Sequence, residues 1–380
     1  MSQSEEQRML IETVKRFLDK EIKPYVEEFE KTQRPVTKEL VKKLLPFGYI
    51  GGMLPESAGG AELTHTTYFQ IIEELSRVWP SLRAMTSTIN GVMTNIYEYG
   101  TQEQREKYVK PLLNVDATGF FALTEPNVGS DTASIEMRAS LRGDKWIING
   151  AKVFITNGVE GDIGIVIAQT DKSKGIDGIA AFIVEKGMGY IARPIEKMGT
   201  VCCSLAELSF EDVEVPKENM LGPIGAGLRL GLNFLNAGRV MVSFIAAGVA
   251  QACIDASVEY AKNRVQFGRP IGGFQLIQEK IADMVTVTTA MRQLSLHASE
   301  LLDKGLPCKR EASMAKVFAT ENVLRVAEQA MQIHGGCGYT KEFPVERLYR
   351  DIRHFTIAEG SSEIQRLIIG RDVLGISAFK

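Results

Sequence analysis

The chain has 380 residues, of which 44% are hydrophobic, and it carries a formal net charge of -3. At roughly 100–200 residues per domain, this length predicts two or three domains, and the composition is that of a globular protein with large apolar cores. The mild negative charge shows no sign of the clustered basic face that nucleic-acid binding requires, so we expect no nucleic acid among the partners.

The N-terminus and the cysteines predict a cytoplasmic protein. The first ten residues are polar and acidic, unlike a secretory or transit leader. No apolar run comes near the roughly 18 residues that cross a bilayer. An odd count of five cysteines, without a C-x-x-C pair, predicts reduced thiols, and the four histidines lack metal-ligand spacing. We therefore expect a cytoplasmic localisation, no membrane span and no metal.

Residues 1–115 are predicted to form an N-terminal helical domain. Apolar residues recur at helical spacing from Met9 to Val26. Further helices are predicted over residues 37–47, 66–78, 82–99 and 102–113. The segment 54–60 between them is predicted to be a loop, because it contains one proline and two glycines.

Residues 116–222 change to the period of two that is typical of strands. Apolar residues alternate with polar ones from Ile135 to Leu141. Short apolar runs follow at 146–148, 153–155, 163–168, 179–184 and 208–215. Because no helical stretch separates them, these strands predict an antiparallel, barrel-like or sandwich domain rather than a parallel sheet.

Residues 223–380 return to the helical period. Helices are predicted over residues 228–265, 274–302, 309–334 and 362–374. Long helices joined by short loops with glycine and proline are typical of a four-helix bundle. The fold class expected from the whole chain is therefore α+β and multidomain, with helical, β and helical domains in that order.

Glu359 is the candidate general base. It follows the apolar run 355–358 and precedes Gly360. Ser362 and Gln365 have the S-x-x-Q spacing of a capping box, which predicts that a helix begins there. Desolvation would raise the pKa of Glu359 toward neutrality, as proton abstraction requires, while the helix N-terminus would lower it. The alternative is an acid that only complements the helix dipole.

Four other segments each fit a binding role or a structural one. The loop 123–131 either presents N–H and hydroxyl groups to a ligand or is an ordinary turn. Phe154 and Thr156 share one face of a strand, either to cover a flat ring or to fill a core. The segments 264–275 and 332–338 either hold a pyrophosphate or cap helices. Since no G-x-G-x-x-G unit or P-loop is present, a Rossmann-type site has little support.

Taken together and in this order, the segments resemble the acyl-CoA dehydrogenase family over essentially the whole chain. The resemblance implies an N-terminal α domain, a middle β domain and a C-terminal four-helix domain. It implies FAD bound between the last two domains and partly across a subunit interface. It also implies a homotetramer, built as a dimer of dimers.

The resemblance assigns roles to individual positions. Glu359 is the base, and the substrate-binding residues are Ser130, Arg239, Arg83 and Gly360. The FAD-binding residues are Phe121, Leu123, Thr124, Ser130, Phe154, Thr156, Arg264, Gln266, Phe267, Gln275, Gln332, Gly335, Gly336, Ser361 and Glu363. In this scheme the residues of the 264–267 segment reach the diphosphate of FAD in a neighbouring subunit, and those of 332–336 meet its adenosine half.

The resemblance also implies a reaction. Glu359 would remove the α-proton of an acyl-CoA thioester while the β-hydride passes to the flavin, and the backbone N–H of Glu359 would help to stabilise the enolate. An electron-transferring flavoprotein would accept the electrons. Alternatives are a short- or medium-chain enzyme, an enoyl-CoA reductase running in reverse, an acyl-CoA oxidase, for which the chain is short, or a CoA-ester scaffold, which the presence of Glu359 disfavours.

Arg83 bears on the identity of the acyl group. It falls near the start of the predicted helix 82–99, where a cation opposes the helix dipole. The glutaryl-CoA dehydrogenase branch uses an arginine in this helix to hold a distal carboxylate, so the resemblance implies a dicarboxylic, cyclic or aromatic substrate such as glutaryl- or benzylsuccinyl-CoA. The alternative is a solvated arginine. The chain departs from the family pattern at three places. Phe154 stands where many members have Trp, and Asn236 replaces an acid. The segment with Val201, Cys202 and Cys203 lacks an arginine that is common in the family near Val201.

Overall fold

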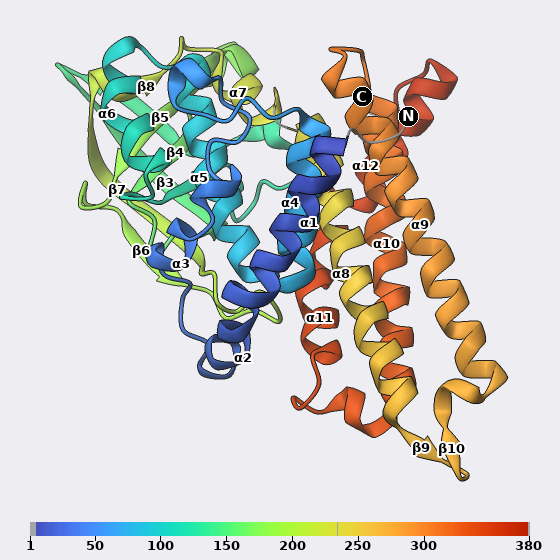
Figure 1. Cartoon of the computed structure of the whole chain (residues 1–380). Coiled ribbons are helices and arrows are strands. Elements are labelled where there is room, and N and C mark those ends of the chain that lie inside the picture. The colour runs from blue at the N-terminus through green and yellow to red at the C-terminus, as the bar shows by residue number, and fades with distance from the viewer. Residues whose placement is uncertain (1–4, 234, 379–380) are drawn as a thin grey trace.

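The computed structural model describes residues 5–233 and 235–378, and Figure 1 shows its arrangement. The N-terminal part is helical, with α1 (Glu5–Phe17), α2 (Lys23–Thr32), α3 (Lys38–Lys42), α4 (His65–Val78), α5 (Pro80–Tyr99) and α6 (Gln102–Leu113). A π-helical turn, Leu18–Ile22, joins α1 to α2. The periodic apolar positions Val14, Leu18, Ile22 and Val26 are buried, so the spacing that predicted this helix marks its core-facing side.

The helix predicted over residues 37–47 is shorter in the structure. Thr37 caps α3 by accepting a hydrogen bond from the N–H of Leu40, but α3 ends at Lys42 and residues 45–47 form a separate 3-10 turn. Pro46 explains the difference, because it has no backbone N–H to donate and it disfavours the helical conformation of Leu45.

The middle part is one eight-stranded sheet. Its strands are β1 (Gly119–Ala122), β2 (Arg138–Arg142), β3 (Lys145–Thr156), β4 (Ile163–Gln169), β5 (Ile179–Glu185), β6 (Ile191–Pro194), β7 (Leu205–Pro216) and β8 (Met220–Leu221). The order is β6-β7-β3-β2-β4-β5-β8, with β1 beside β4. Most pairs are antiparallel as predicted, but β1 and β2 pair with β4 in parallel. The apolar runs predicted strands but contained no signal for these long-range partners.

The C-terminal part is a helical bundle (Figure 1). The bundle contains α8 (Leu235–Asn263), α9 (Gln275–Asp303), α10 (Lys309–His334), α11 (Val345–Ile352) and α12 (Ser362–Leu374). Helix α7 (Gly227–Asn233) precedes the bundle and packs against β4 and β5 of the sheet. The predicted boundaries after residues 115 and 222 fall between α6 and β1 and between β8 and α7. Helix α8 packs against α4, α9 and α10, so it joins the N-terminal helices to the bundle.

The long helix predicted over residues 228–265 ends at Asn263, and a hairpin follows it. Strands β9 (Val265–Gln266) and β10 (Arg269–Pro270) pair across Phe267 and Gly268. These two residues have φ values of 51° and 75°. Positive φ at both central residues is what a two-residue type I′ turn requires. The segment 264–275 therefore contains a protruding hairpin. The interpretation that this segment only caps the preceding helix is excluded.

One helical stretch bears on the expectation that no segment of the chain crosses a bilayer. Among the described residues, Gly227–Asn263 is long and apolar enough to do so by length and composition. However, 72% of its most apolar window is buried inside the protein. That burial is the environment of a core helix, as its packing between α4 and α10 requires.

A buried ion pair fixes the segment that follows β1. Lys152 on β3 is 0% exposed, and its Nζ donates to the carboxylate of Glu125 at 2.7 Å and to the carbonyl of Leu123 at 2.9 Å. The carboxylate of Glu125 also accepts the backbone N–H groups of Glu136 and Met137. All of these bonds converge on the residues around Thr124, which the resemblance places beside the flavin.

We expect loss of this ion pair to be costly. Glu125→Ala would leave a buried ammonium without its carboxylate, and it should lower the free energy of unfolding by about 3–5 kcal/mol in urea denaturation. The double variant Glu125→Gln/Lys152→Met should recover part of that loss, because it removes the unpaired ammonium while the amide oxygen of glutamine can still accept the backbone N–H groups of Glu136 and Met137. Glu214→Ala, which removes the exposed partner of Lys145 on the same strand, is the control and should cost about 0.5 kcal/mol. Equal costs for the two single variants would contradict the prediction.

Candidate active site

Glu359 lies on a short loop with an unusual backbone. Glu359 and Gly360 have φ values of 58° and 83°, and left-handed backbone is unfavourable for a residue with a side chain. Two buried side chains hold the loop. The Nε2 of Gln365 donates to the carbonyls of Glu359 at 3.2 Å and of Gly360 at 2.8 Å, and the Nζ of Lys316 donates to the carbonyl of Gly360 at 2.8 Å. Helices α10 and α12 therefore both position the carboxylate.

The predicted capping box is wrong by one residue. Ser361, not Ser362, is the N-cap of α12, and its hydroxyl accepts the N–H of Ile364 at 3.4 Å. Ser362 is buried and its hydroxyl has no hydrogen-bond partner. By sequence, Ser361 and Ser362 fit the N-cap position equally well. In the structure, the left-handed backbone of Gly360 comes directly before Ser361, and Ser361 is the N-cap. Gln365, predicted to close the box, instead anchors the Glu359 loop.

The carboxylate of Glu359 faces the start of α8. A side chain at Gly238 would lie 3.3 Å from its Oε2, so glycine leaves the space that the carboxylate occupies. Glu359 remains accessible to solvent, yet the surrounding protein removes enough water to raise the pKa of its carboxyl. Lys316, Arg239 and Arg83 oppose that rise in this order. An ionisable group with a raised pKa among cations is suited to accept a proton.

Arg239 is 5% exposed, and its guanidinium donates to the side chain of Asn236 at 3.2 Å. Its Nε is buried without a partner. Burial lowers the pKa of Arg239, and the charge of Glu359 acts against that decrease. The sequence-based assignment of Arg239 to the substrate arm stays a prediction, and the unpaired Nε provides a donor for such a ligand.

Arg83 is buried, which excludes the solvated alternative. It is 6% exposed, and its guanidinium carbon lies 5.1 Å from the centre of the Phe355 ring. The hydroxyl of Ser87, at 3.4 Å, is a long and therefore weak acceptor, and Nε has no partner. Burial lowers the pKa of Arg83 to about 10, against the charges of Cys203, Glu359, Tyr68 and Asp351.

The residues predicted to lie along the flavin ring form a half-exposed group on the middle domain. Phe121, Leu123 and Thr124 are half-buried. Phe121 and Leu123 both come within 4 Å of the Cβ position of Gly231 on α7. Phe154 is 61% exposed, and it has a φ of 60° at a register irregularity of β3. The alternative that Phe154 fills a core is therefore excluded.

The remaining predicted positions differ in their exposure. Thr156 is half-buried two residues after Phe154 on β3, and Ile155 between them is buried. Ser130 is exposed in the loop after β1. Ser361 is the half-buried cap of α12, and Glu363 is exposed in its first turn.

A pocket at the β9–β10 hairpin brings two distant segments together. Its volume is about 480 Å³, and Arg264, Gln266, Gly335 and Gly336 are among the residues that line it. Nothing lies within 4 Å of the Cβ position of either glycine, so the backbone there is open to a ligand. Phe267 is 92% exposed at the hairpin tip. Gln275 and Gln332 are exposed and do not line the pocket.

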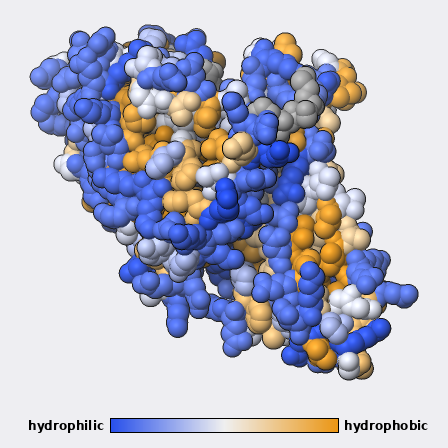
Figure 2. Space-filling model, in the orientation of Figure 1, coloured by the Kyte–Doolittle hydropathy of each residue, from blue (hydrophilic) through white to orange (hydrophobic). Residues whose placement is uncertain are grey.

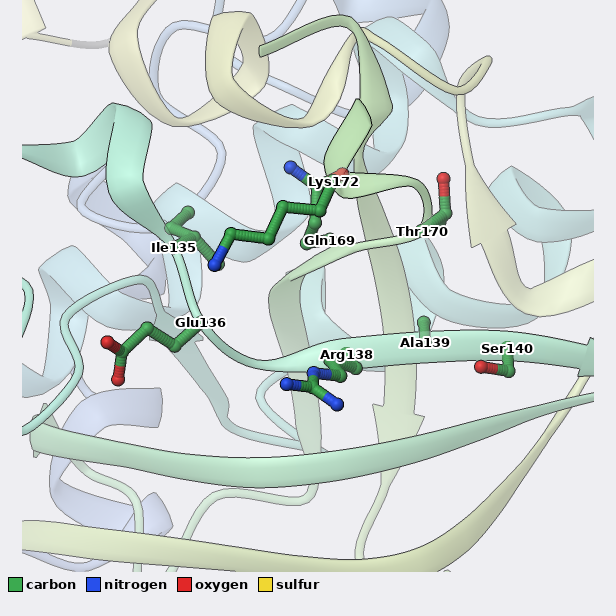
Figure 3. Close-up of a pocket in the computed structure, with 8 residues that line it drawn as sticks. All are labelled: Ile135, Glu136, Arg138, Ala139, Ser140, Gln169, Thr170 and Lys172. Atoms are coloured by element: carbon green, nitrogen blue, oxygen red, sulfur yellow. The ribbon is translucent and has the colours of Figure 1, made fainter. Parts of the chain in front are cut away.

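A second depression, of about 360 Å³, lies between β2 and the segment after β4. Figure 3 shows Lys172 extending toward Ile135, with Arg138 on β2. None of the predicted site residues lines it. Among the described residues there is no group of three or more His, Cys, Asp or Glu side chains that could hold a metal.

Sequence reasoning missed Lys316, Gln365 as a loop anchor, and Lys152. Both lysines are 0% exposed. Lys316 could have been found, because it lies among the small buried residues Ala312, Ala315 and Ala319 on one face of α10; a charged residue on an apolar helix face is costly and calls for a reason. Lys152 had no comparable signal, since the irregularity of β3 disturbs the alternation.

Comparison with known proteins identifies the family. Models of the acyl-CoA dehydrogenase N-terminal, middle and C-terminal domains match residues 4–116, 120–213 and 225–374. An acyl-CoA dehydrogenase of Bacillus subtilis is 43% identical over 99% of this chain and 100% of its own length. The chain belongs to the acyl-CoA dehydrogenase family, and it is an oxidoreductase acting on CH–CH donors.

Two further relatives are named as reductases. A 3-(aryl)acrylate reductase of Clostridium sporogenes is 41% identical over 97% of this chain and 99% of its own length. A subunit of the caffeyl-CoA reductase-Etf complex of Acetobacterium woodii is 39% identical over 96% of this chain and 97% of its own length.

Solved structures match the whole fold. A chain from a structure of the electron transferring flavoprotein of Acidaminococcus fermentans has a TM-score of 0.94 at 40% identity, covering 98% of this chain and 99% of its own. A glutaryl-coenzyme A dehydrogenase glutaryl-CoA complex has a TM-score of 0.94 at 35% identity, covering 99% and 96%. A glutaryl-CoA dehydrogenase of Mycobacterium smegmatis in complex with FADH2 has a TM-score of 0.93 at 31% identity, covering 100% and 97%.

Proposed function

We propose that the protein interconverts an acyl-CoA thioester and its 2-enoyl-CoA, with Glu359 as the base that removes the α-proton. The observation that carries this proposal is the setting of Glu359. Its loop is held by Lys316 and Gln365, its carboxyl has a raised pKa, and Gly238 leaves room beside it. A positioned carboxyl that becomes ionised closer to neutral pH can take a weakly acidic proton.

The residues around Glu359 also suit the thioester. Arg239 offers a buried unpaired donor, and its charge acts on the carboxylate of Glu359, which supports its assignment to the substrate arm. The N–H of Glu359 lies in the loop whose carbonyls are already used by Gln365 and Lys316, so the loop's geometry is fixed before substrate arrives. Fixed donors stabilise developing negative charge without reorganisation.

The chain's residues fit FAD. Exposed Phe154 and half-buried Phe121 and Leu123 offer an apolar surface for a flat ring, and Thr156 offers a hydroxyl beside it. The hairpin pocket offers Arg264, Gln266 and open glycine backbone, which suit a diphosphate and an adenosine. When bound, FAD would supply the hydride acceptor. The solved relative with FADH2 supports this cofactor.

The proposed FAD site has two parts, the apolar surface for the flavin ring and the hairpin pocket. Their arrangement supports a homotetramer built as a dimer of dimers. None of the described residues that surround Glu359 lines the hairpin pocket, which is compatible with the assignment, implied by the family resemblance, of this pocket to the FAD of a neighbouring subunit. Phe267 is 92% exposed at the hairpin, and Leu276 and Val285 on α9 are 70% and 45% exposed. Figure 2 shows apolar surface over this part of the bundle. Exposed apolar groups of this size are typical of subunit interfaces.

Replacing Arg264 should weaken FAD binding. Loss of a charge-assisted contact costs about 1.5–3 kcal/mol, so Arg264→Ala should retain FAD about 10–100-fold more weakly in a fluorescence release assay. Arg269→Ala is the matched control, because Arg269 lies in the same hairpin but stacks on Phe274, 4.2 Å from the ring centre. If Arg264→Ala held FAD as tightly as the control, the pocket would not be part of the FAD site.

We propose an electron-transferring flavoprotein as the redox partner. The caffeyl-CoA reductase subunit belongs to an Etf complex, and the chain from Acidaminococcus fermentans comes from a study of an electron transferring flavoprotein. Oxidation of the thioester releases two electrons that must leave the enzyme before the next turnover. A cytoplasmic localisation fits this role and stays a prediction.

We propose that the acyl group carries a hydrogen-bond acceptor or a ring at its distal end. Arg83 is buried with an unpaired Nε and only one weak acceptor, so a bound acyl group with an oxygen would satisfy it. Phe355 beside it offers a ring face. The relatives named for aryl-acrylate and caffeyl-CoA, and the glutaryl-CoA complex, support aromatic or dicarboxylic chains.

The second candidate function is enoyl-CoA reduction in the reverse direction, which the two relatives named as reductases favour. One experiment tests both. Purified protein should show a flavin spectrum and lose its absorbance under anoxia with an acyl-CoA from a panel of butyryl, glutaryl and arylpropionyl thioesters. Faster reoxidation by the matching enoyl-CoA than bleaching by the acyl-CoA would favour the reductase. A protein that neither binds FAD nor bleaches with any thioester would contradict both.

A further inference from the structure

Lys316 carries a buried charge that has no role in the reaction proposed above. It lies in the middle of α10 and is 0% exposed. Among the described residues, its ammonium has one hydrogen-bond acceptor, the carbonyl of Gly360, at 2.8 Å. Burying an ammonium with so little compensation is unfavourable, and a methionine of similar shape would avoid that cost.

The position of Lys316 indicates what its charge does. Its acceptor is the carbonyl of the residue that follows Glu359, in a loop where both residues have positive φ. Among the charges that act on Glu359, Lys316 has the largest effect in favour of the carboxylate. The same ammonium therefore reaches the base in two ways, through the backbone and through space.

We propose that Lys316 is a positioning residue for the base: its ammonium fixes the Glu359–Gly360 loop and keeps the Glu359 carboxylate ionised. The inference rests on the proposed role of Glu359. Gln365 shares only the first of these tasks, because it holds the same carbonyl without a charge. The pair Lys316 and Gln365 therefore separates mechanical support of the loop from electrostatic support of the base.

Other charges surround both groups and define the test. Arg239 on α8 and Arg83 on α5 also favour the ionised form of Glu359. Lys316 is acted on by Glu359, Arg239, Glu363 and Glu321. Burial lowers the pKa of Lys316 to about 8, so the ammonium is charged at neutral pH and below. Removing this cation should make the carboxylate harder to form, which moves the titration of Glu359 to higher pH.

A titration that does not need turnover tests the electrostatic part. Infrared difference spectra between each protein and its Glu359→Gln counterpart report the protonation of Glu359. In Lys316→Met we expect the midpoint to move up by about one pH unit, in Gln365→Leu to stay within about 0.3 units, and in Lys316→Arg to return toward the wild-type value. Coincident midpoints for Lys316→Met and wild type would overturn the inference.

The pH profile of anaerobic flavin bleaching is the second readout. Both Lys316→Met and Gln365→Leu should slow bleaching by about 10–100-fold, because the base is less well placed, but only Lys316→Met should move the acid limb to higher pH. Lys316→Met is expected to fold, since replacing a buried charge by an apolar side chain is often neutral or stabilising. If the wild-type protein bleaches and Lys316→Met has the same acid limb as the wild type, the inference about Lys316 is overturned but the proposed function is not. If the wild-type protein does not bleach, the proposed function itself is overturned.

Discussion

Replacing Glu359 with glutamine is expected to slow anaerobic flavin bleaching by about 10³-fold or more, because a general base contributes roughly 10²–10⁴-fold and no other carboxylate is placed in the same loop. FAD and the thioester should still bind, since the fold and the hairpin pocket are unchanged. Stopped-flow absorbance with the best acyl-CoA of the panel measures the rate.

The pH dependence of the wild-type rate adds to this prediction. Glu359 acts in its ionised form, so the rate should rise as the pH passes upward through its pKa. Desolvation by the surrounding protein raises that pKa, so the rise should occur at higher pH than for an ordinary glutamate. Glu98→Gln is the matched control, because burial also raises the pKa of Glu98 but no neighbouring charge acts on it. A Glu359→Gln variant that bleaches as fast as Glu98→Gln would remove Glu359 from the reaction.

Removing the guanidinium of Arg83 should change which acyl groups are accepted. We expect Arg83→Met to lower kcat/KM by about 10²-fold for a thioester with a distal carboxylate, because a charge-assisted hydrogen bond contributes about 3 kcal/mol. Butyryl-CoA, which has no acceptor at that end, should lose at most about threefold. The comparison of kcat/KM values across the panel measures the effect.

Two controls sharpen this prediction. Arg83→Lys keeps the charge but not the planar donors, so it should recover only part of the loss. The free energy of unfolding of Arg83→Met should not fall, since the guanidinium has an unpaired Nε and a weak contact to Ser87. Equal losses on every thioester would show that Arg83 supports the pocket rather than selecting the substrate. Unchanged kinetics on the glutaryl thioester would exclude it altogether.

The parts of the fold that follow a local pattern could be predicted from the sequence. The predicted helices over residues 309–334 and 362–374 coincide with α10 and α12, because regular apolar spacing and glycine ends define them. The parallel pairing of β1 with β4 could not be predicted, since residues 119–122 and 163–166 carry no mark of each other. Pro46 is a local signal that predicts the early end of α3.

The site shows the same division. Glu359 could be proposed from its neighbours in the chain, and Arg83 from its conflict with the helix dipole; both roles stay predictions. The burial of Arg83, the space at Gly238 and the hold of Lys316 on Gly360 depend on contacts between α5, α8, α10 and the loop before α12. Such contacts join residues more than 40 positions apart, so only the folded chain displays them.

A crystal structure of the protein with FAD and a CoA thioester that cannot be oxidised tests the central claim most directly. The measured quantity is the distance from the nearer carboxylate oxygen of Glu359 to the carbon next to the thioester carbonyl. We expect about 3–3.5 Å, the separation from which a proton can be transferred, with the flavin ring on the opposite side of that carbon. A Glu359 side chain that points to solvent, away from the thioester, would contradict the claim.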